Sequence, residues 1–381
     1  MPLQSATATP DVAARPAVQF TGLDSLRCFA ALAIVIYHST LGLAELRQLP
    51  RSVGKVLHNL PVGVDFFLLI SGFLITYLLL AEKSRTGTIS LPRFYVRRAL
   101  RIFPLYFLIV GVAWWLHADA HPEIDFRPYL YFWGNFWMIE TNNWTVATLN
   151  PLWSLCIEEQ FYLVIPLLVL LLPTRRLPAL FGGIVVLSIA FRIYATLSLT
   201  VEGNWMTIYC HTLSRCDLLA LGGLLAWRHF TQPIRLQLAP WLLPAAGLFL
   251  GLLLSIIDGS DFSTTHLAAF KKYLYVAPLM LIFSYVVFNE LTPTAPAAVQ
   301  RVVDYLGKIS YGLYMYHSPI IFSFDDNFPL DSFPPNEYNP YLRVVIIVLL
   351  TVAVSAVSYE LFEKQILRLK KRFEVVRTAR A

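Results

Sequence analysis

The sequence predicts an all-α protein, a polytopic transmembrane helical bundle. The first observation is the composition, because 57% of the 381 residues are hydrophobic and only 14% are charged. Soluble domains carry roughly 25% charged residues, so a chain of this size with a mean hydropathy of +0.59 is too apolar for water. The second observation is a series of apolar stretches, each close to the roughly 20 residues that a helix needs to cross a bilayer.

Ten such stretches follow one another along the chain and give the expected spans. They are 25–44, 61–81, 99–117, 152–172, 177–199, 212–228, 236–257, 270–288, 305–323 and 340–362. Two aromatic and polar runs, near 128–138 and 141–150, are too short to span, so we expect an external loop or a re-entrant piece there. About ten spans place both termini on the same side of the membrane.

The basic residues decide the orientation. If the N-terminus is cytoplasmic, twenty-one of the thirty Lys and Arg residues lie in inner segments or at inner helix ends, seven lie outside, and Arg192 and Arg215 lie within spans. The positive-inside rule therefore predicts that both termini are cytoplasmic. The net charge of +6 comes from this asymmetry, so it favours membrane lipid and anionic cytosolic ligands as partners rather than nucleic acid.

We expect one membrane domain with short tails. Residues 1–19 predict a disordered cytoplasmic tail, residues 20–365 the transmembrane domain, and residues 366–381 a basic cytoplasmic tail. The four cysteines have neither metal-ligand spacing nor a paired framework, so they predict small buried side chains and no metal site. The alternative for Cys210 and Cys216, near the outer face, is a disulfide bridge.

Arg27 and His38 lie eleven residues apart in the first apolar stretch. In a helix both side chains face the same way, about 16 Å apart along the axis, and ionisable groups within a span usually face a protein interior or a wet cavity. A neutral imidazole can act as general base on a hydroxyl, and the small residues Cys28, Ala31 and Val35 would leave a slot between the two side chains. The alternative is a snorkelling Arg27 and a structural His38.

A basic cluster opens the third stretch. Arg98 and Arg101 are spaced i, i+3, and Arg97 and Arg101 are spaced i, i+4, so they crowd one helical turn. A helix N-terminus and guanidinium forks both favour anions, which predicts a phosphate-bearing cytosolic ligand. The alternative is an ordinary positive-inside anchor.

The fourth stretch begins with polar residues on one face. Ser154, Glu158 and Tyr162 are spaced i, i+4, i+8, and two adjacent carboxylates within a span need a cation or a wet cavity. Glu158 is the candidate for the wet site, at the end where an acceptor would enter. Glu159 points about 100° away and is an interfacial residue or a partner for another helix.

Other ionisable residues fall toward the outer half of the membrane. Asp65 can orient or charge-balance His38, or it can cap a helix or form a structural pair. Arg215 and Asp217 favour a network that stabilises the fold over a catalytic pair. His317 is a second candidate histidine, weaker than His38.

These motifs together resemble those of acyltransferase family 3. The resemblance covers roughly 20–365 and rests on Arg27-x10-His38 after Gly22-Leu-Asp24, Val64-Asp65-Phe-Phe, Ser71-Gly-Phe, Arg98-x-x-Arg101, Trp153-Ser-Leu-x-x-Glu158-Glu-Gln-Phe-Tyr162, Arg215-x-Asp217 and Ser310-Tyr-Gly-Leu-Tyr-x-x-His317, in this order. The chain differs at Cys156, where a small hydroxyl residue is common in the family.

The resemblance implies an inner-membrane O-acyltransferase that moves an acyl group, commonly acetyl, from cytosolic acyl-CoA to a carbohydrate. Acyl-CoA is then a co-substrate, and no cofactor is expected. The acceptor would be an extracytoplasmic glycan or glycolipid, or a small molecule. Because the chain ends soon after its tenth stretch, we expect it to act alone or with a partner protein.

Taken together, the residues and the resemblance assign three sets of site residues. The catalytic set is His38, Glu158 and Asp65; the acyl-CoA set is Arg27, Arg97, Arg98 and Arg101; the acceptor set is Trp153, Ser154, Tyr162, Arg215 and His317. Further tryptophans, Trp133, Trp137 and Trp144, can stack on sugar faces or form an interfacial aromatic belt.

Two functions from other classes compete with acyl transfer. A glycolipid or anion transporter or flippase would also carry buried Arg, His and Asp along its path, but the sequence shows no inverted repeat. A non-catalytic membrane scaffold leaves the buried charges unexplained.

Overall fold

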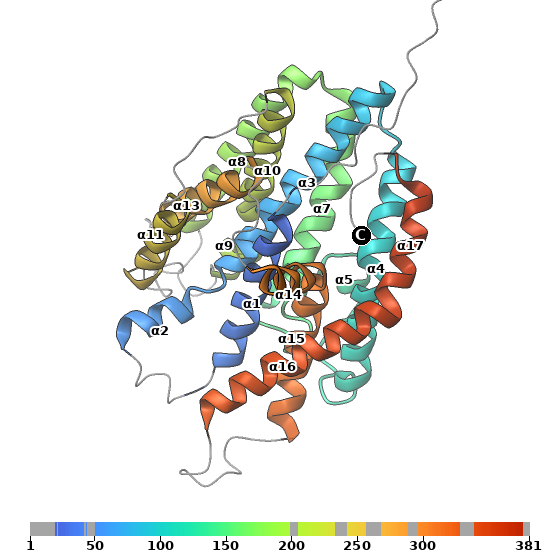
Figure 1. Cartoon of the computed structure of the whole chain (residues 1–381). Coiled ribbons are helices and arrows are strands. Elements are labelled where there is room, and N and C mark those ends of the chain that lie inside the picture. The colour runs from blue at the N-terminus through green and yellow to red at the C-terminus, as the bar shows by residue number, and fades with distance from the viewer. Residues whose placement is uncertain are drawn as a thin grey trace, which may run out of the picture.

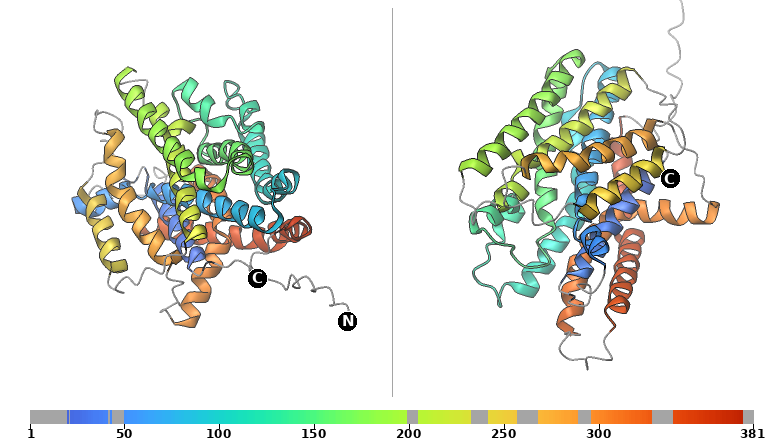
Figure 2. Two further views of the ribbon diagram at one scale, coloured as in Figure 1. Left: turned by 90° about the horizontal axis from the view of Figure 1, so that it is seen from above. Right: turned by 90° about the vertical axis from the view of Figure 1, so that its left-hand side faces the viewer.

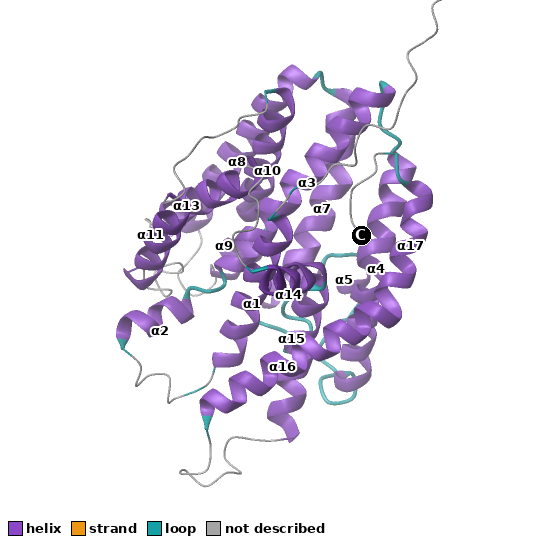
Figure 3. Ribbon diagram, viewed as in Figure 1, coloured by secondary structure: helices purple, strands orange, loops and turns teal. Residues whose placement is uncertain are grey.

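The structure, a computed structural model, describes residues 20, 22–41, 43, 50–198, 205–232, 242–256, 268–288, 296–327 and 339–375. Within these ranges every regular element is a helix, which confirms the all-α class (Figure 3). The expected tail 1–19 lies outside the described residues, as do 376–381 at the end of the chain.

In the described ranges, ten long helices overlap the ten expected stretches. They are α1 (Leu23–Thr40), α3 (Val62–Thr86), α4 (Leu91–His117), α7 (Leu152–Leu171), α8 (Leu177–Ser198), α10 (Thr212–Thr231), α11 (Leu242–Ile256), α13 (Ala268–Phe288), α15 (Ser310–Asn327) and α16 (Pro340–Ser358). The shorter elements are α2 (Arg51–His58), α5 (Arg127–Leu130), α6 (Gly134–Thr141), η2 (Thr174–Arg176), α9 (Trp205–Cys210), α14 (Ala297–Lys308), η4 (Tyr359–Glu363), α17 (Lys364–Lys370) and η5 (Lys371–Phe373). Helices α5 and α6 fall in the region expected to be too short to span.

The ninth expected stretch, 305–323, is corrected by the structure. The chain bends at Ile309, so that α14 ends there and α15 begins as a separate helix. Helix α14 packs on the start of α1 and lies across the direction of its neighbours (Figure 2). The approach is close because a Cβ atom on Gly307 would stand 2.0 Å from the carbonyl oxygen of Asp24. The absence of a side chain at Gly307 therefore allows α14 to pack closely on the start of α1.

Helix α3 lies at the centre of the bundle, between α10 and α7 (Figure 1). Two glycines let α3 and α10 touch through their backbones, since a Cβ on Gly72 would stand 2.0 Å from the carbonyl oxygen of Leu219, and one on Gly222 would stand 2.2 Å from that of Leu69. Such contacts between small residues replace the hydrophobic effect, which does not drive helix association in lipid. They fix the register of α3, which carries one wall of the site.

The last helix is longer than expected. A single turn of π-helix, η4, joins α16 to α17, and helical structure continues to Phe373. This places 366–373, part of the expected basic tail, in a helix that packs against α4. Arg97 holds the end of the segment by donating from Nη1 to the carbonyl oxygen of Phe373 at 2.8 Å.

Among the residues that the structure describes, five helical segments are long and apolar enough to cross a membrane. They are Arg51–Thr86, Leu91–His117, Leu152–Leu171, Thr174–Ser198 and Tyr341–Phe373. The protein is therefore a helical membrane protein, while the full number of spans and the cytoplasmic termini stay predictions.

Cysteine labelling tests the predicted orientation. The four native cysteines are free and buried, so the alternative of a Cys210–Cys216 bridge is not realised and the native background is low. We expect a membrane-impermeant maleimide, added to intact cells, to label Asn143→Cys between α6 and α7 and to leave Thr88→Cys between α3 and α4 unlabelled. Both positions are exposed, so accessibility alone does not separate them. The reverse pattern would overturn the topology.

Candidate functional site

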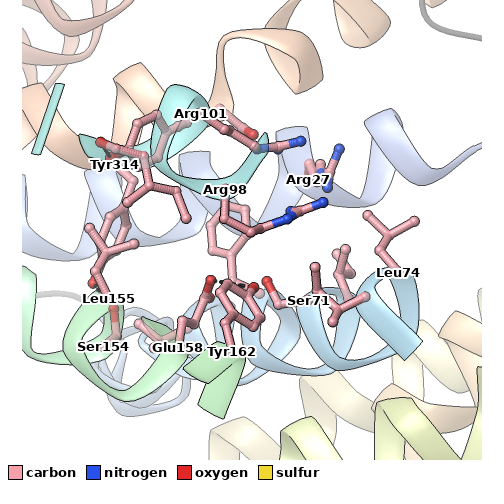
Figure 4. A pocket seen from close by; sticks show the side chains of 17 residues that line it. Arg27, Ser71, Leu74, Arg98, Arg101, Ser154, Leu155, Glu158, Tyr162 and Tyr314 are labelled. Carbon is pink, nitrogen blue, oxygen red and sulfur yellow. Dashed lines mark hydrogen bonds between the residues drawn. The ribbon is translucent and has the colours of Figure 1, made fainter. Parts of the chain in front are cut away.

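A cavity lies between five helices, α1, α3, α4, α7 and α15 (Figure 4). Its lining gathers residues from six of the quoted motifs. The lining consists of Arg27, Val64, Phe67, Ile70, Ser71, Leu74, Ile75, Arg98, Arg101, Ile102, Ser154, Leu155, Glu158, Tyr162, Ser310, Tyr311 and Tyr314. Six of the twelve predicted site residues therefore share one space: Arg27, Arg98, Arg101, Ser154, Glu158 and Tyr162.

The expected face of α7 is present in the cavity wall. The hydroxyl of Tyr162 donates to Glu158 Oε2 at 2.9 Å, as the i, i+4 spacing allows, and Ser71 of α3 lines the cavity beside this carboxylate. Glu158 is only 9% exposed. The carboxylate is thus held in place by the Tyr162 hydroxyl while it faces the cavity.

The position of Glu158 relative to the arginines corrects one expectation. We predicted Glu158 at the acceptor end, away from the donor arginines, but Arg101 and Arg98 are its charged neighbours in the same cavity. The reason is that the first halves of α4 and α7 both line this cavity. Glu158 therefore lies between the cationic part of the cavity and the rest of the site.

Two arginines of the cavity have no carboxylate partner at ion-pair distance within the described ranges. Arg98 lies over the rings of Phe94 and Tyr162, 5.7 and 5.9 Å from their centroids, and its Nε atom is buried without a hydrogen-bond partner. Arg101 likewise forms no ion pair there, whereas Arg27 lies 3.5 Å from Asp24. Arg98 and Arg101 are both half-buried. Their guanidinium groups can form charge-assisted hydrogen bonds, so this end of the cavity suits an anion.

Arg97 lies elsewhere than its two neighbours. Its guanidinium donates to Glu82 Oε2 at 3.0 Å and to the end of η5, and it does not line the cavity. Arg97 and Arg101 lie on neighbouring turns of α4, as their i, i+4 spacing predicts. Arg97 nevertheless points away from the cavity, because its guanidinium pairs with the buried carboxylate of Glu82 on α3. The geometry gives Arg97 a role in joining α3, α4 and η5.

Two charged residues near the arginines were not predicted from the sequence. Lys370 of α17 interacts electrostatically with Arg101 and Arg98, and Glu363 of the π-turn, 9% exposed, interacts with Arg101. A π-turn inside a longer helix often marks a functional site, but this turn is seen only in the structure, so the sequence alone did not indicate Glu363. No sequence pattern indicated a role for Lys370, because only the packing of α17 on α4 brings it close to Arg98 and Arg101.

His38 and His317 form a pair beside the cavity. The Nδ1 atom of His38 is 3.1 Å from His317 Nε2 and 3.1 Å from the carbonyl oxygen of Ile34. His317 is fully buried, and its Nδ1 is 2.6 Å from the carbonyl oxygen of Tyr314. Because Tyr314 also lines the cavity, the histidine pair lies directly behind its wall, on the α1 and α15 side.

The slot expected along α1 is filled. Ala31 and Val35 are 0% and 1% exposed and pack against Ile309 and Leu313, at the bend between α14 and α15. The small residues therefore serve close helix packing, and the open space lies between α1, α3, α4, α7 and α15. His38 is linked to the wall of that space through His317 and Tyr314.

Asp65 and Arg215 form an ion pair of 2.8 Å. Within the described residues, Asp65 is not among the hydrogen-bond partners of His38, so the predicted orienting contact is not observed. Arg215 also lies over the rings of Tyr209 and Trp153, 4.5 and 5.2 Å from their centroids. Trp153 is 4% exposed, which leaves little of its ring for an acceptor.

Asp217 pairs with Arg192 rather than with Arg215. The Nη1 atom of Arg192 lies 3.0 Å from Asp217 Oδ2, and both side chains are almost fully buried. The two charges of the Arg215-x-Asp217 motif thus reach different helices. This arrangement agrees with the expected network that stabilises the fold.

The fold and the site together define a class of protein, a helical membrane protein with an anion-attracting cavity beside a buried histidine pair. Residues 20–360 match the family model of the acyltransferase domain of acyltransferase family 3, and the chain belongs to that family. This confirms the resemblance seen in the motifs.

The chain is similar to O-acetyltransferases of Staphylococcus aureus. The O-acetyltransferase OatA of Staphylococcus aureus (strain NCTC 8325 / PS 47) is 28% identical over 370 residues, which cover 91% of this chain and 57% of OatA. A putative O-acetyltransferase of Staphylococcus aureus (strain COL) is 28% identical over 363 residues, 90% of this chain and 56% of the relative. The chain thus spans little more than half the length of these relatives. No solved structure matches the chain.

Proposed function

We propose that the protein is a membrane O-acyltransferase of the bacterial inner membrane. It moves an acyl group, in the simplest case acetyl, from cytosolic acyl-CoA to a hydroxyl of an extracytoplasmic glycan or glycolipid. The observation that carries the proposal is the single cavity that combines unpaired guanidiniums, a held carboxylate and a wall shared with a histidine pair. The names of the two relatives support the acetyl group.

The cavity suits the shape of the donor. CoA has a phosphate-rich head and a long, thin pantetheine arm that ends in the thioester. Arg98 and Arg101 would hold the phosphates, since planar forks bind phosphate oxygens in pairs. The arm would then follow the apolar lining past Ile70 and Phe67 toward Tyr314 and the histidines.

His38 would act as the general base. The acceptor hydroxyl gives its proton to His38 while its oxygen attacks the thioester carbonyl carbon. The carbon–sulfur bond then breaks, and the thiolate leaves and takes the proton from His38, so that free CoA and the ester are formed. No group other than donor and acceptor is consumed.

Turnover of radiolabelled acetyl-CoA by the purified protein tests this function. We expect release of free CoA together with label on a glycan or glycolipid acceptor, and neither product without the acceptor. Movement of unmodified glycolipid across vesicles without release of CoA would instead support the flippase. Modification of a soluble acceptor in the cytosolic compartment alone would support a small-molecule acyltransferase.

A double variant, Arg98→Lys with Arg101→Lys, tests the donor site. Lysine keeps the charge but not the planar fork, and a hydrogen bond to a charged group contributes about 1.5–3 kcal/mol, so we expect CoA affinity to fall by about tenfold to a hundredfold. Calorimetry with CoA measures the change. Arg93→Lys, an exposed residue on the same helix, is the matched control. Unchanged CoA affinity in the double variant would remove these arginines from the donor site.

A further inference from the structure

The hydrogen bonds of the histidine pair determine where its protons lie. A carbonyl oxygen only accepts hydrogen bonds, so the Nδ1 atom of His317, 2.6 Å from the Tyr314 carbonyl oxygen, carries a proton. A neutral imidazole carries one proton, which leaves His317 Nε2 as an acceptor. The bond between the two rings is therefore donated by His38 Nδ1.

The same assignment follows from the second partner of His38. Its Nδ1 atom is also 3.1 Å from the carbonyl oxygen of Ile34, one turn earlier in α1, which again requires a proton on Nδ1. The proton is shared between Ile34 and His317. The Nε2 atom of His38 is then the nitrogen with the free lone pair.

We propose that His317 is a positioning residue that fixes this tautomer of His38 and so keeps its Nε2 atom ready to accept the proton of the acceptor hydroxyl. This inference rests on the proposed function. It gives His317 a role different from the acceptor contact expected from the sequence, and its complete burial favours action through His38 over contact with substrate.

The surroundings of His317 hold it in register with His38. Three residues before it, the hydroxyl of Tyr314 donates to the carbonyl oxygen of Pro151 at 2.7 Å and lies 2.8 Å from Ser154 Oγ. One residue after it, Ser318 donates to the carbonyl oxygen of Ala147. The two anchors lie at the start of α7 and in the loop that precedes it, so α15 cannot rotate about its axis without breaking them. The His317 ring is thereby kept against α1.

The contact strengthens during the reaction. When His38 accepts a proton at Nε2 it becomes an imidazolium, and its Nδ1–H bond to His317 becomes charge-assisted. An interaction that strengthens only on the way to the transition state affects kcat rather than donor binding. Loss of His317 should therefore lower kcat and leave the KM for acyl-CoA unchanged.

Two amide variants separate this role from simple packing. The side-chain oxygen of glutamine reaches the place of His Nε2, whereas asparagine reaches only the place of Nδ1. We expect His317→Gln to keep kcat within about tenfold of the unchanged protein and His317→Asn to lose about a hundredfold, the lower range for general-base catalysis. The KM for acetyl-CoA should be the same in all three. Equal kcat values in the two variants, each checked for folding by gel filtration, would overturn the proposal, as would a folded Gln variant with more than a hundredfold loss.

A second measurement asks whether His317 acts through His38. In a His38→Ala background, adding His317→Asn should change the residual rate by less than about twofold, because groups that act as a unit are not additive. A further loss as large as that in the single variant would overturn the proposal.

If the unchanged protein released no CoA with any acceptor, the proposed function would fall and this role with it. Turnover with an additive His317 effect overturns this role alone.

Discussion

His38→Ala is expected to abolish acyl transfer while the protein still inserts and binds CoA. The substitution removes the proposed base without placing a charge in the bilayer, and loss of a general base costs about a hundredfold to ten-thousandfold in rate. Release of CoA from acetyl-CoA in the presence of acceptor measures the effect. CoA binding should be unchanged, because the arginines that would hold the phosphates lie in the cavity and His38 lies behind its Tyr314 wall.

An exposed histidine provides the control. His121→Ala, in the loop after α4, removes an imidazole far along the chain from the pair and should leave the rate within about twofold, the ordinary effect of a surface substitution. If His38→Ala turned over acetyl-CoA at near-normal rate, His38 would have no role in the chemistry. The proposed positioning role of His317 would then be excluded as well.

The long apolar helices could be predicted because each depends on one stretch of sequence alone. A bilayer-crossing helix must satisfy its own backbone and present apolar side chains, so hydropathy locates it. The shared face of Ser154, Glu158 and Tyr162 was predictable for the same reason, since helical spacing alone aligns the three side chains. The Tyr162–Glu158 hydrogen bond in the structure agrees with that alignment.

What could not be predicted depends on which helix meets which. Arg97 and Arg98 are adjacent, yet one joins Glu82 and the other lines the cavity, because their side chains point about 100° apart toward different helices. The pairing of Asp65 with Arg215, 150 positions later, has no local signal at all. The bend at Ile309 was missed because the apolar stretch 305–323 runs through it with Lys308 as its one charged residue.

The ion pair between Asp65 and Arg215 gives the largest expected effect on stability. Asp65 is 3% exposed and Arg215 is 8% exposed, so Asp65→Ala would leave a buried guanidinium without its carboxylate. Removing one partner of a buried pair costs about 3–5 kcal/mol. We expect a much lower midpoint of thermal unfolding in detergent and a low yield of folded protein.

A double variant decides whether Asp65 stabilises the fold or takes part in catalysis. Asp65→Ala combined with Arg215→Met removes both charges, and because methionine fills much of the space of the arginine stem, most of the lost stability should return. A catalytic Asp65 would give a different pattern, in which Asp65→Ala folds normally and only turnover is lost. The geometry favours the first pattern, because other groups also fix the guanidinium of Arg215. It donates a 2.7 Å hydrogen bond to the carbonyl oxygen of Tyr209 and lies over the rings of Tyr209 and Trp153. The carboxylate of Asp65 therefore completes a structural site built around the guanidinium.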